Sequence, residues 1–544
     1  MQLSLQRWFG SGAFRQLVET ICRPLMKLPS RSSAVIFSVL FLLGGALIST
    51  RLLDSNAFSG SAREPEPGKA LTASRITLPD KIPKKHLEIP LDCTALNRTG
   101  TCPSNYPRAI EEEEPGPRST CPEYFRWIHE DLRAWAHTGI TREAVETAKR
   151  TANFRLVIVN GKAYVERYQK SFQTRDVFTL WGILQLLRRY PGKVPDLELM
   201  FDCVDWPVVG KSGGYGENGP NTTGPPPLFR YCGDDRTLDI VFPDWSFWGW
   251  PEINLKPWEG LQKELREGNT KKRWMEREAY AYWKGNPAVA ETRMDLMKCN
   301  VSEEHDWNAR VFAQVRFLDW VKESQQGYKQ SDLANQCLHR YKIYIEGSAW
   351  SVSQKYIMAC DSLTLIVKPH YYDFFTRSLV PVHHYWPIQE HDKCKSIKFA
   401  VDWGNSHKHK AQEIGKAASS FIQDELKMDY VYDYMLHLLT QYSKLLTFKP
   451  VVPKGAVELC SESMACNAAG LENKFMMESL VKGPSERAPC TIPPPYDPPS
   501  LSAVLRRNSN SIKQVELWEK RYWDNQNNSS RLRGIGCYTI YRGD

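Results

Sequence analysis

The sequence predicts an α/β fold in two lobes, and three observations carry this prediction. Residues 341–368 have the pattern of a strand, a glycine turn, a helix and a second strand, which is a parallel βαβ unit. Another buried strand, residues 197–201, follows an apolar helical run and ends in carboxylates. A chain of 544 residues that is 42% hydrophobic can bury a large core in two globular lobes with appendages.

The βαβ unit begins with Tyr341 to Ile345, a β-branched and aromatic run that breaks at Glu346 and Gly347. Ser351 and Gln354 have capping-box spacing, and apolar residues then recur at helical spacing before the strand 363–368. The helix N-terminus would lie at the carboxyl end of the first strand, where its unpaired N–H groups bind anions such as phosphates. A βαβ unit with nothing bound is the alternative interpretation.

The N-terminus predicts a membrane anchor. Basic residues outnumber acidic ones in residues 1–31, and no charge occurs from Ser32 to Thr50. An apolar stretch of this length is just long enough to cross a bilayer as a helix, and the preceding basic residues would keep the N-terminus in the cytosol. We therefore predict a cytosolic tail over residues 1–32 and a type II signal-anchor over 33–50, with the rest lumenal. A cleaved signal peptide is the alternative, but no convincing cleavage site follows the run.

Glycosylation sequons and cysteines agree with a lumenal location. Thirteen of the fourteen cysteines follow the anchor and include no CxxC metal pair, so disulfides are expected, with at least one thiol left over. The net charge of +9 is scattered along the chain and predicts no nucleic-acid partner. The predicted N-glycosylation sites are Asn97, Asn221, Asn300, Asn527 and Asn528.

Residues 51–118 are rich in Pro, Glu, Lys and Ser and predict a flexible stem, within which Cys93 and Cys102 can close a small loop. The first lobe, residues 119–275, should begin with a helix near Cys121. A hairpin turning at Asn160-Gly161 and a helix over 176–190 would follow.

Two segments of the first lobe are candidates for chemistry. Asp202 and Asp205 lie just past the strand 197–201, where α/β sheets keep reactive groups, although they could simply cap the turn before Pro207. The segment 242–258 is too rich in aromatic rings and prolines for a regular helix. It could form an aromatic wall of a cleft or an irregular part of the core.

The second lobe, residues 276–450, should contain a strand at 280–283 that runs into Lys284 and Gly285. The βαβ unit follows, then a strand over Ile397 to Val401 and a long amphipathic closing helix around residues 431–445. The C-terminal extension, residues 451–544, contains cysteines and a proline-rich segment that is expected to be extended.

Five separated motifs resemble, in order, those of the Rumi-type protein O-glucosyltransferases, glycosyltransferase family 90. They are VPDLELMFDCVDWP, DIVFPDWSFWGWP, AYWKGNP, EGSAWSVSQKYIMACDS and VHHYWPI. The resemblance covers about residues 121–446. The whole chain looks like a plant member that carries a membrane anchor and a tail.

The resemblance implies a GT-B fold, with two Rossmann-like lobes and a cleft between them. It also implies an inverting transfer from a UDP-sugar to a glycoprotein or polysaccharide hydroxyl in the Golgi or endoplasmic reticulum, without metal or cofactor. The family's catalytic base falls on Asp205, and its flanking disulfide falls on Cys337 and Cys360. The other implied contacts are Lys284, Gly285, Gly347, Ser348, Ala349, Trp350, Ser351, Val352 and Ser353 for the donor, and Trp206, Trp245, Phe247 and Trp248 for the acceptor.

The sequence departs from the animal members at the donor side. They have arginines where this chain has Lys284, Glu346 and Ser353. A glutamate facing a diphosphate would repel it, so phosphate contacts are expected from Lys355, Arg293 or backbone N–H groups. These departures leave glucose and xylose both open as the sugar.

Two other functions remain possible from the sequence. A catalytically silent glycan-binding or scaffold protein on the same fold would explain Glu346 and Ser353. A glycoside hydrolase could use Asp202 and Asp205, although two carboxylates three residues apart on one loop need not flank a glycosidic bond.

Overall fold

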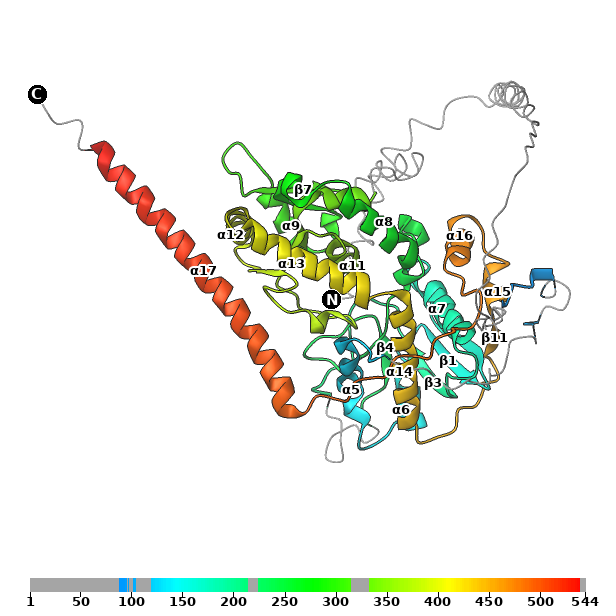
Figure 1. Cartoon of the computed structure of the whole chain (residues 1–544). Coiled ribbons are helices and arrows are strands. Elements are labelled where there is room, and N and C mark those ends of the chain that lie inside the picture. The colour runs from blue at the N-terminus through cyan, green and yellow to red at the C-terminus, as the bar shows by residue number, and fades with distance from the viewer. Residues whose placement is uncertain are drawn as a thin grey trace, which may run out of the picture. The chain divides into compact units, whose positions relative to one another are not determined.

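Two β-sheets, one in each lobe, position the candidate site (Figure 1). The computed structural model describes residues 88–94, 96, 101–103, 119–213, 224–314 and 332–538, without the side chains of 529–538. All of these residues belong to one unit, Lys84–Asp544. The predicted α/β class is confirmed.

The first sheet has six strands in the order β11-β2-β1-β3-β4-β5. The predicted hairpin is present as an antiparallel pair, and its turn residues have left-handed φ angles of 52° at Asn160 and 73° at Gly161. β3 and β4 are parallel, as are β4 and β5. The strands are β1 Phe154–Val159, β2 Lys162–Arg167, β3 Leu197–Phe201, β4 Leu228–Arg230, β5 Ile240–Val241 and β11 Val457–Leu459.

Helices surround this sheet, and the last helix of the predicted second lobe returns to it. The Tyr442 hydroxyl on α14 donates to the Glu198 carbonyl, and the Trp248 indole donates to Tyr432, also on α14. The amphipathic stripe of α14 is therefore buried in the core of the first lobe. The helices are η2 Glu123–Arg126, α5 Trp127–Asp131, η3 Arg133–Trp135, α6 Arg142–Ala148, α7 Arg175–Arg189, η4 Trp245–Phe247, η5 Pro251–Ile253, α8 Trp258–Thr270 and α14 Met428–Leu445.

The second sheet is entirely parallel, in the order β10-β9-β8-β6-β7. The predicted βαβ unit is confirmed as β8, α11 and β9. The strands are β6 Glu278–Gly285, β7 Ala309–Ala313, β8 His339–Tyr344, β9 Leu363–Val367 and β10 Trp386–Ile388. The helices are η6 Trp274–Glu276, η7 Pro287–Val289, α9 Glu291–Leu296, η8 Met297–Cys299, η10 Ala334–Leu338, α11 Ser353–Met358, η11 Thr376–Ser378, α12 Lys393–Ser406, α13 Lys408–Ser420 and η12 Phe421–Glu425.

The predicted strand at Ile397 to Val401 is wrong, because these residues lie within α12. This segment has five residues, four of them apolar and one a lysine, and it fits a buried helix as well as a strand. Periodicity over so short a segment cannot distinguish the two. Ile397, Phe399 and Val401 are buried in the core of the second lobe.

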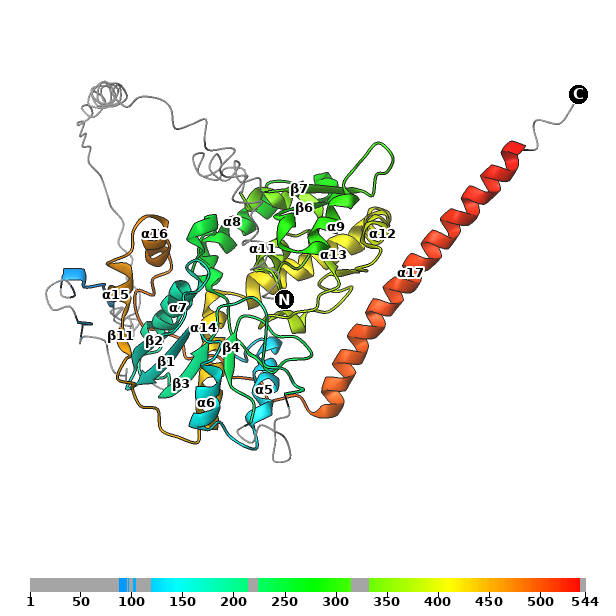
Figure 2. The same cartoon turned by 180° about the vertical axis from the view of Figure 1, so that it is seen from behind.

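The C-terminal extension is more ordered than the sequence predicted. Residues 492–497 are irregular, but β11 adds a strand to the first sheet, and α15 Ser461–Ala465, α16 Gly470–Glu478 and α17 Pro498–Tyr538 follow. Figures 1 and 2 show the long α17 beside α12. Val515 is buried there, and the Glu519 carboxylate accepts from Ser396.

The predicted Cys93–Cys102 loop is also wrong. The structure joins Cys93 to Cys466 and Cys102 to Cys460, each across more than 350 residues. The Ile89 amide also donates to the Lys482 carbonyl. The described part of the predicted stem is therefore fixed to the C-terminal extension.

The predicted anchor, residues 33–50, lies outside the described residues, as do Asn97 and Asn221. None of the helices in the described ranges is both long and apolar enough for a bilayer crossing. Of the other sequons, Asn527 and Asn528 are exposed on α17, and Asn300 accepts from the Val311 amide.

Candidate active site

Asp205 lies four residues beyond the end of β3, on the loop where the sequence placed the catalytic base. Its carboxylate is 25% exposed, and Oδ1 accepts from Nη1 of Arg175 at 2.5 Å. Arg175 begins α7, donates also to the Cys203 carbonyl, and stacks on the Trp245 ring at 4.5 Å. A buried guanidinium thus fixes one oxygen of a carboxylate that stays open to solvent.

Asp202 has a different environment. Its carboxylate is buried and paired with Arg230, whose Nε also lies 3.2 Å from Oδ1 of Asp239. Burial raises the pKa of Asp202, and the charge of Arg230 opposes that shift. Burial also raises the pKa of Asp239 to about 6. This internal network holds the loop before Asp205. A glycoside hydrolase would need Asp202 as a second accessible carboxylate, and Asp202 is buried.

The predicted acceptor-side aromatics divide into two groups. Trp206 is 44% exposed beside Asp205, so it can meet an acceptor. Trp245, Phe247 and Trp248 are almost fully buried, which argues against a direct contact of these rings with the acceptor. The interpretation of 242–258 as an irregular core segment is the one that the structure supports, because the rings of this segment support Arg175 and pack against α14.

The turn after β8 carries the predicted donor contacts, but it lacks the predicted capping box. α11 begins only at Ser353 and has no side-chain cap. The Ser351 hydroxyl lies 2.9 Å from that of Ser353, and the Ser351 amide donates to the Tyr344 hydroxyl. Ser348, Ser351, Val352 and Ser353 are partly exposed, whereas Ala349 and Trp350 are buried. Only the first group can contact a ligand directly.

Arg293 lies against this turn. Its guanidinium donates to the carbonyls of Ile345, Glu346 and Asn286, and it forms no ion pair with a carboxylate of the described residues. A Cβ on Gly347 would lie 3.4 Å from Nη2 of Arg293, which is an ordinary van der Waals distance, so the guanidinium lies directly beside the turn. Burial lowers the pKa of Arg293, although the group remains a cation at neutral pH. A positive charge therefore lies at the carboxyl end of β8.

Lys284 and Gly285 end β6, the strand next to β8, as the motif predicted. Lys355 does not belong with them. Its Nζ is buried 3.2 Å from Oδ2 of Asp244 and 2.7 Å from Oγ of Ser246. This lysine joins α11 to η4, and its engagement there argues against a contact with the donor.

Glu346 does not act as a free charge at the turn. Its Oε1 accepts from the amides of His370 and Tyr371, at 3.0 and 2.8 Å. Burial raises its pKa. The loop after β9 thus holds the Glu346 carboxylate. Its place beside the turn in the sequence therefore does not mean that it repels a diphosphate bound there.

Asp373 predicts a pH-dependent stability. Burial raises its pKa from 3.8 to about 7, despite amide donors from Phe375 and Thr376. Between roughly pH 4 and 7 the folded chain holds a proton that the unfolded chain has released, so stability falls as the pH rises through this window. Asp373→Asn keeps the hydrogen-bond acceptor without the charge. Its melting temperature should therefore fall less between about pH 5 and 8 than that of the wild type. Equal losses in thermal melts of the two proteins would contradict the prediction.

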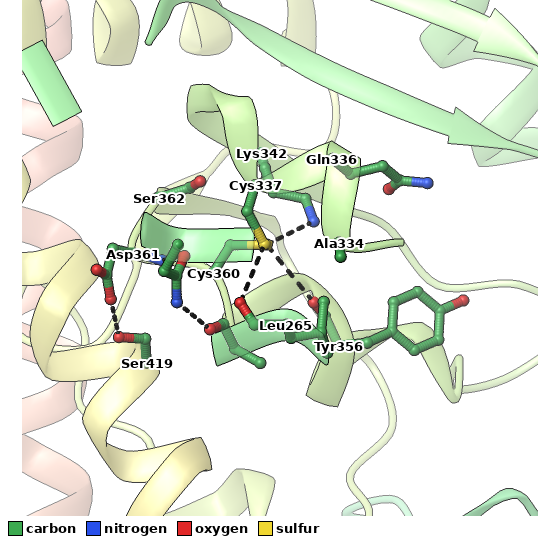
Figure 3. Close-up of a disulfide and its surroundings, with 12 residues drawn as sticks. Leu265, Ala334, Gln336, Cys337, Lys342, Tyr356, Cys360, Asp361, Ser362 and Ser419 are labelled. Atoms are coloured by element: carbon green, nitrogen blue, oxygen red, sulfur yellow. Dashed lines mark hydrogen bonds between the residues drawn. A yellow bond between two sulfur atoms is a disulfide. The ribbon is translucent and has the colours of Figure 1, made fainter. Parts of the chain in front are cut away.

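Cys337 and Cys360 form the disulfide that the family resemblance implied, joining η10, which precedes β8, to the segment that follows α11. Figure 3 shows the Lys342 side chain directed at it, with Nζ 3.3 Å from Sγ of Cys360. Burial lowers the pKa of Lys342 to about 7. The bridge fixes both elements that flank the donor turn.

Removing this bridge should weaken the second lobe. The double variant Cys337→Ala/Cys360→Ala releases a loop of sequence separation 23 and should lower the free energy of unfolding by about 3 kcal/mol. Urea titration followed by tryptophan fluorescence measures this change. An unchanged midpoint would show that packing alone holds the turn.

Sequence reasoning missed Arg175, His370 and Glu390. Arg175 carried a usable signal, because a cation at the first position of a helix opposes the helix dipole and calls for a carboxylate partner. His370 lies 3.3 Å from a carboxylate oxygen of Glu346 and 3.3 Å from one of Glu390. No local sequence pattern predicts these two contacts.

Comparison with known proteins identifies the family of the chain. The profile of glycosyl transferase family 90 matches residues 116–519. Protein O-glucosyltransferase 1 of Bos taurus is 25% identical over 368 residues, which cover 64% of this chain and 86% of the relative. O-glucosyltransferase rumi of Drosophila melanogaster is 22% identical over 346 residues, which cover 61% of this chain and 79% of the relative.

Solved structures also match. One of them is the C-terminal domain of a glycosyl transferase group 1 family protein from Francisella tularensis, with 12% identity and a TM-score of 0.21 over 33% of this chain and 100% of that domain. The family assignment rests on the sequence match alone, which spans most of the chain. The chain therefore belongs to glycosyl transferase family 90, as its five motifs predicted.

Proposed function

We propose that this chain is an inverting, metal-independent O-glycosyltransferase that moves glucose or xylose from a UDP-sugar to a hydroxyl of a glycoprotein or glycan. Asp205 is the general base. Its carboxylate takes the proton from the acceptor hydroxyl while that oxygen attacks the anomeric carbon and the bond to UDP breaks. The position of Asp205 carries the proposal, because it is a partly exposed carboxylate held by a buried arginine at the carboxyl end of β3.

Arg293, Lys284 and the turn 347–353 are the proposed donor site. Their common position at the carboxyl ends of β6 and β8 is where parallel sheets bind ligands, and a cation there offsets the charge of departing UDP. A GT-B arrangement, with the acceptor on the first lobe and the donor on the second, is consistent with two separate sheets.

Metal independence is part of the proposal. Within the described ranges, one group of three side chains has metal-ligand spacing, Cys121, His437 and Cys490, and its two cysteines are joined in a disulfide. We expect sugar transfer to be unchanged by an excess of EDTA. Loss of transfer with EDTA, restored by added Mn²⁺ or Mg²⁺, would contradict this expectation.

The proposed cellular location is the lumen of the Golgi or endoplasmic reticulum. Residues 33–50 would supply a type II membrane anchor, and the five disulfides fit an oxidising compartment. Protease protection of the full chain in microsomes, with and without detergent, tests this topology.

The activity test measures binding and hydrolysis of UDP-glucose, UDP-xylose and UDP-galactose by the full chain in detergent. Selective turnover of one donor would support the proposal and identify the sugar. If a folded and glycosylated sample binds neither UDP nor any of the donors, the proposal is overturned.

A further inference from the structure

Three side chains meet at the carboxyl edge of the second sheet. Glu346 follows β8, His370 follows β9 and Glu390 follows β10, and these strands are neighbours in the parallel sheet. Nδ1 of His370 lies 3.3 Å from Oε2 of Glu346, and Nε2 lies 3.3 Å from Oε2 of Glu390. The imidazole therefore connects two carboxylates, and we call these residues the edge cluster.

The edge cluster presents one oriented oxygen to solvent. Nδ1 of His370 is hydrogen-bonded to Glu346, and Nε2 lies at ion-pair distance from Glu390. Both oxygens of Glu346 are occupied by the His370 and Tyr371 loop. Oε1 of Glu390 has no partner among the residues that the structure describes, and its side chain is 28% exposed.

The edge cluster lies near the loops that carry Asp205. Tyr372, two residues after His370, exchanges two backbone hydrogen bonds of 3.0 Å with Gly233. The neighbouring Cys232 thiol donates to the Asp205 carbonyl at 3.1 Å. The loop after β9 thus connects the turn after β8 with the loop of the proposed base.

We infer that Glu390, oriented by His370, binds hydroxyls of the donor sugar and that the edge cluster selects neutral sugars over uronates. This inference rests on the proposed function. We place the sugar ring beside the turn 347–353, against the loops after β9 and β10, because these loops share the carboxyl edge of the sheet with that turn. A fixed carboxylate accepts hydrogen bonds from sugar hydroxyls, but it repels and desolvates the carboxylate of a uronic acid.

The experiment measures the affinities of UDP, UDP-glucose, UDP-xylose and UDP-glucuronic acid for the full chain in detergent by calorimetry. The wild type should bind its neutral donor at least about 30-fold more tightly than the uronate. Glu390→Gln should reduce this ratio to about threefold, because the amide retains the shape without the charge. Glu390→Asp keeps the charge and should still reject the uronate.

Two controls separate the causes. Glu267→Gln removes an exposed charge on α8 and should change no affinity. His370→Leu frees Glu390 from its support and should weaken the neutral donor about tenfold while UDP affinity stays within about twofold.

The outcomes distinguish the inference from the proposed function. Normal UDP binding with an unchanged donor ratio in Glu390→Gln would overturn the inference alone. A wild type that binds UDP-glucuronic acid as tightly as UDP-glucose would also overturn it. A folded wild type that binds neither UDP nor any donor would overturn the proposed function and the inference together.

Discussion

Asp205→Asn is expected to lower the rate of sugar transfer about 10³-fold, while the affinity for UDP stays within about twofold. Asparagine cannot take the proton from the acceptor hydroxyl, so the attacking oxygen must lose it to water. The amide oxygen can still accept from Arg175, so the loop should keep its position. Initial rates at saturating donor and UDP calorimetry on the same samples measure the two quantities.

Asp235→Asn is the matched control for this variant. Asp235 lies on the loop after β4 with an exposed side chain, so its substitution makes the same chemical change away from the proposed base. It should retain transfer and UDP affinity. Wild-type turnover by Asp205→Asn would remove Asp205 from the role of base, whereas loss of UDP binding would show that the substitution had disturbed the fold.

Local patterns predicted the parts of the fold that depend on few neighbours. β3 begins and ends at the predicted residues because its apolar run is bounded by Pro195 and Asp202, and the hairpin turn follows from Asn160 and Gly161. The strand predicted from Ile397 to Val401 was wrong because the segment is too short to show the helical period of α12, which extends beyond it on both sides. Disulfide pairing failed for Cys93 because its partner is 373 residues away.

The candidate site shows the same division. The positions of Asp205 and Arg293 near strand ends follow from patterns local to those ends, whereas the role of Asp205 as base is implied by the family resemblance. The sequence did not show that the charges of Lys355 and Glu346 are engaged by other elements, Asp244 for the lysine and the His370 loop for the glutamate. A sequence shows a charge, but only the fold shows whether that charge is already paired.

Lys355→Met separates the two roles of this lysine. The side chains of Lys355 and Asp244 are almost fully buried, and the lysine also donates to Ser246 and the Val352 carbonyl. Removing one partner of such a buried pair leaves an uncompensated charge, so the free energy of unfolding should fall by about 3–5 kcal/mol. UDP affinity should stay within about twofold below the unfolding transition. Denaturant titration and UDP calorimetry give the two measurements.

Lys263→Met is the control. Lys263 is exposed on α8, so this substitution should cost almost no stability. The double variant Lys355→Met/Asp244→Asn should recover part of the loss, since the amide keeps the hydrogen bond to the Ser246 amide without the buried charge. Unchanged stability with a tenfold or greater loss of UDP affinity would reverse the assignment and return Lys355 to the donor site. The predicted result instead makes Lys355 the buried link between α11 and η4. The turn before α11 carries the proposed donor contacts, and Trp245 of η4 supports the arginine that holds the proposed base.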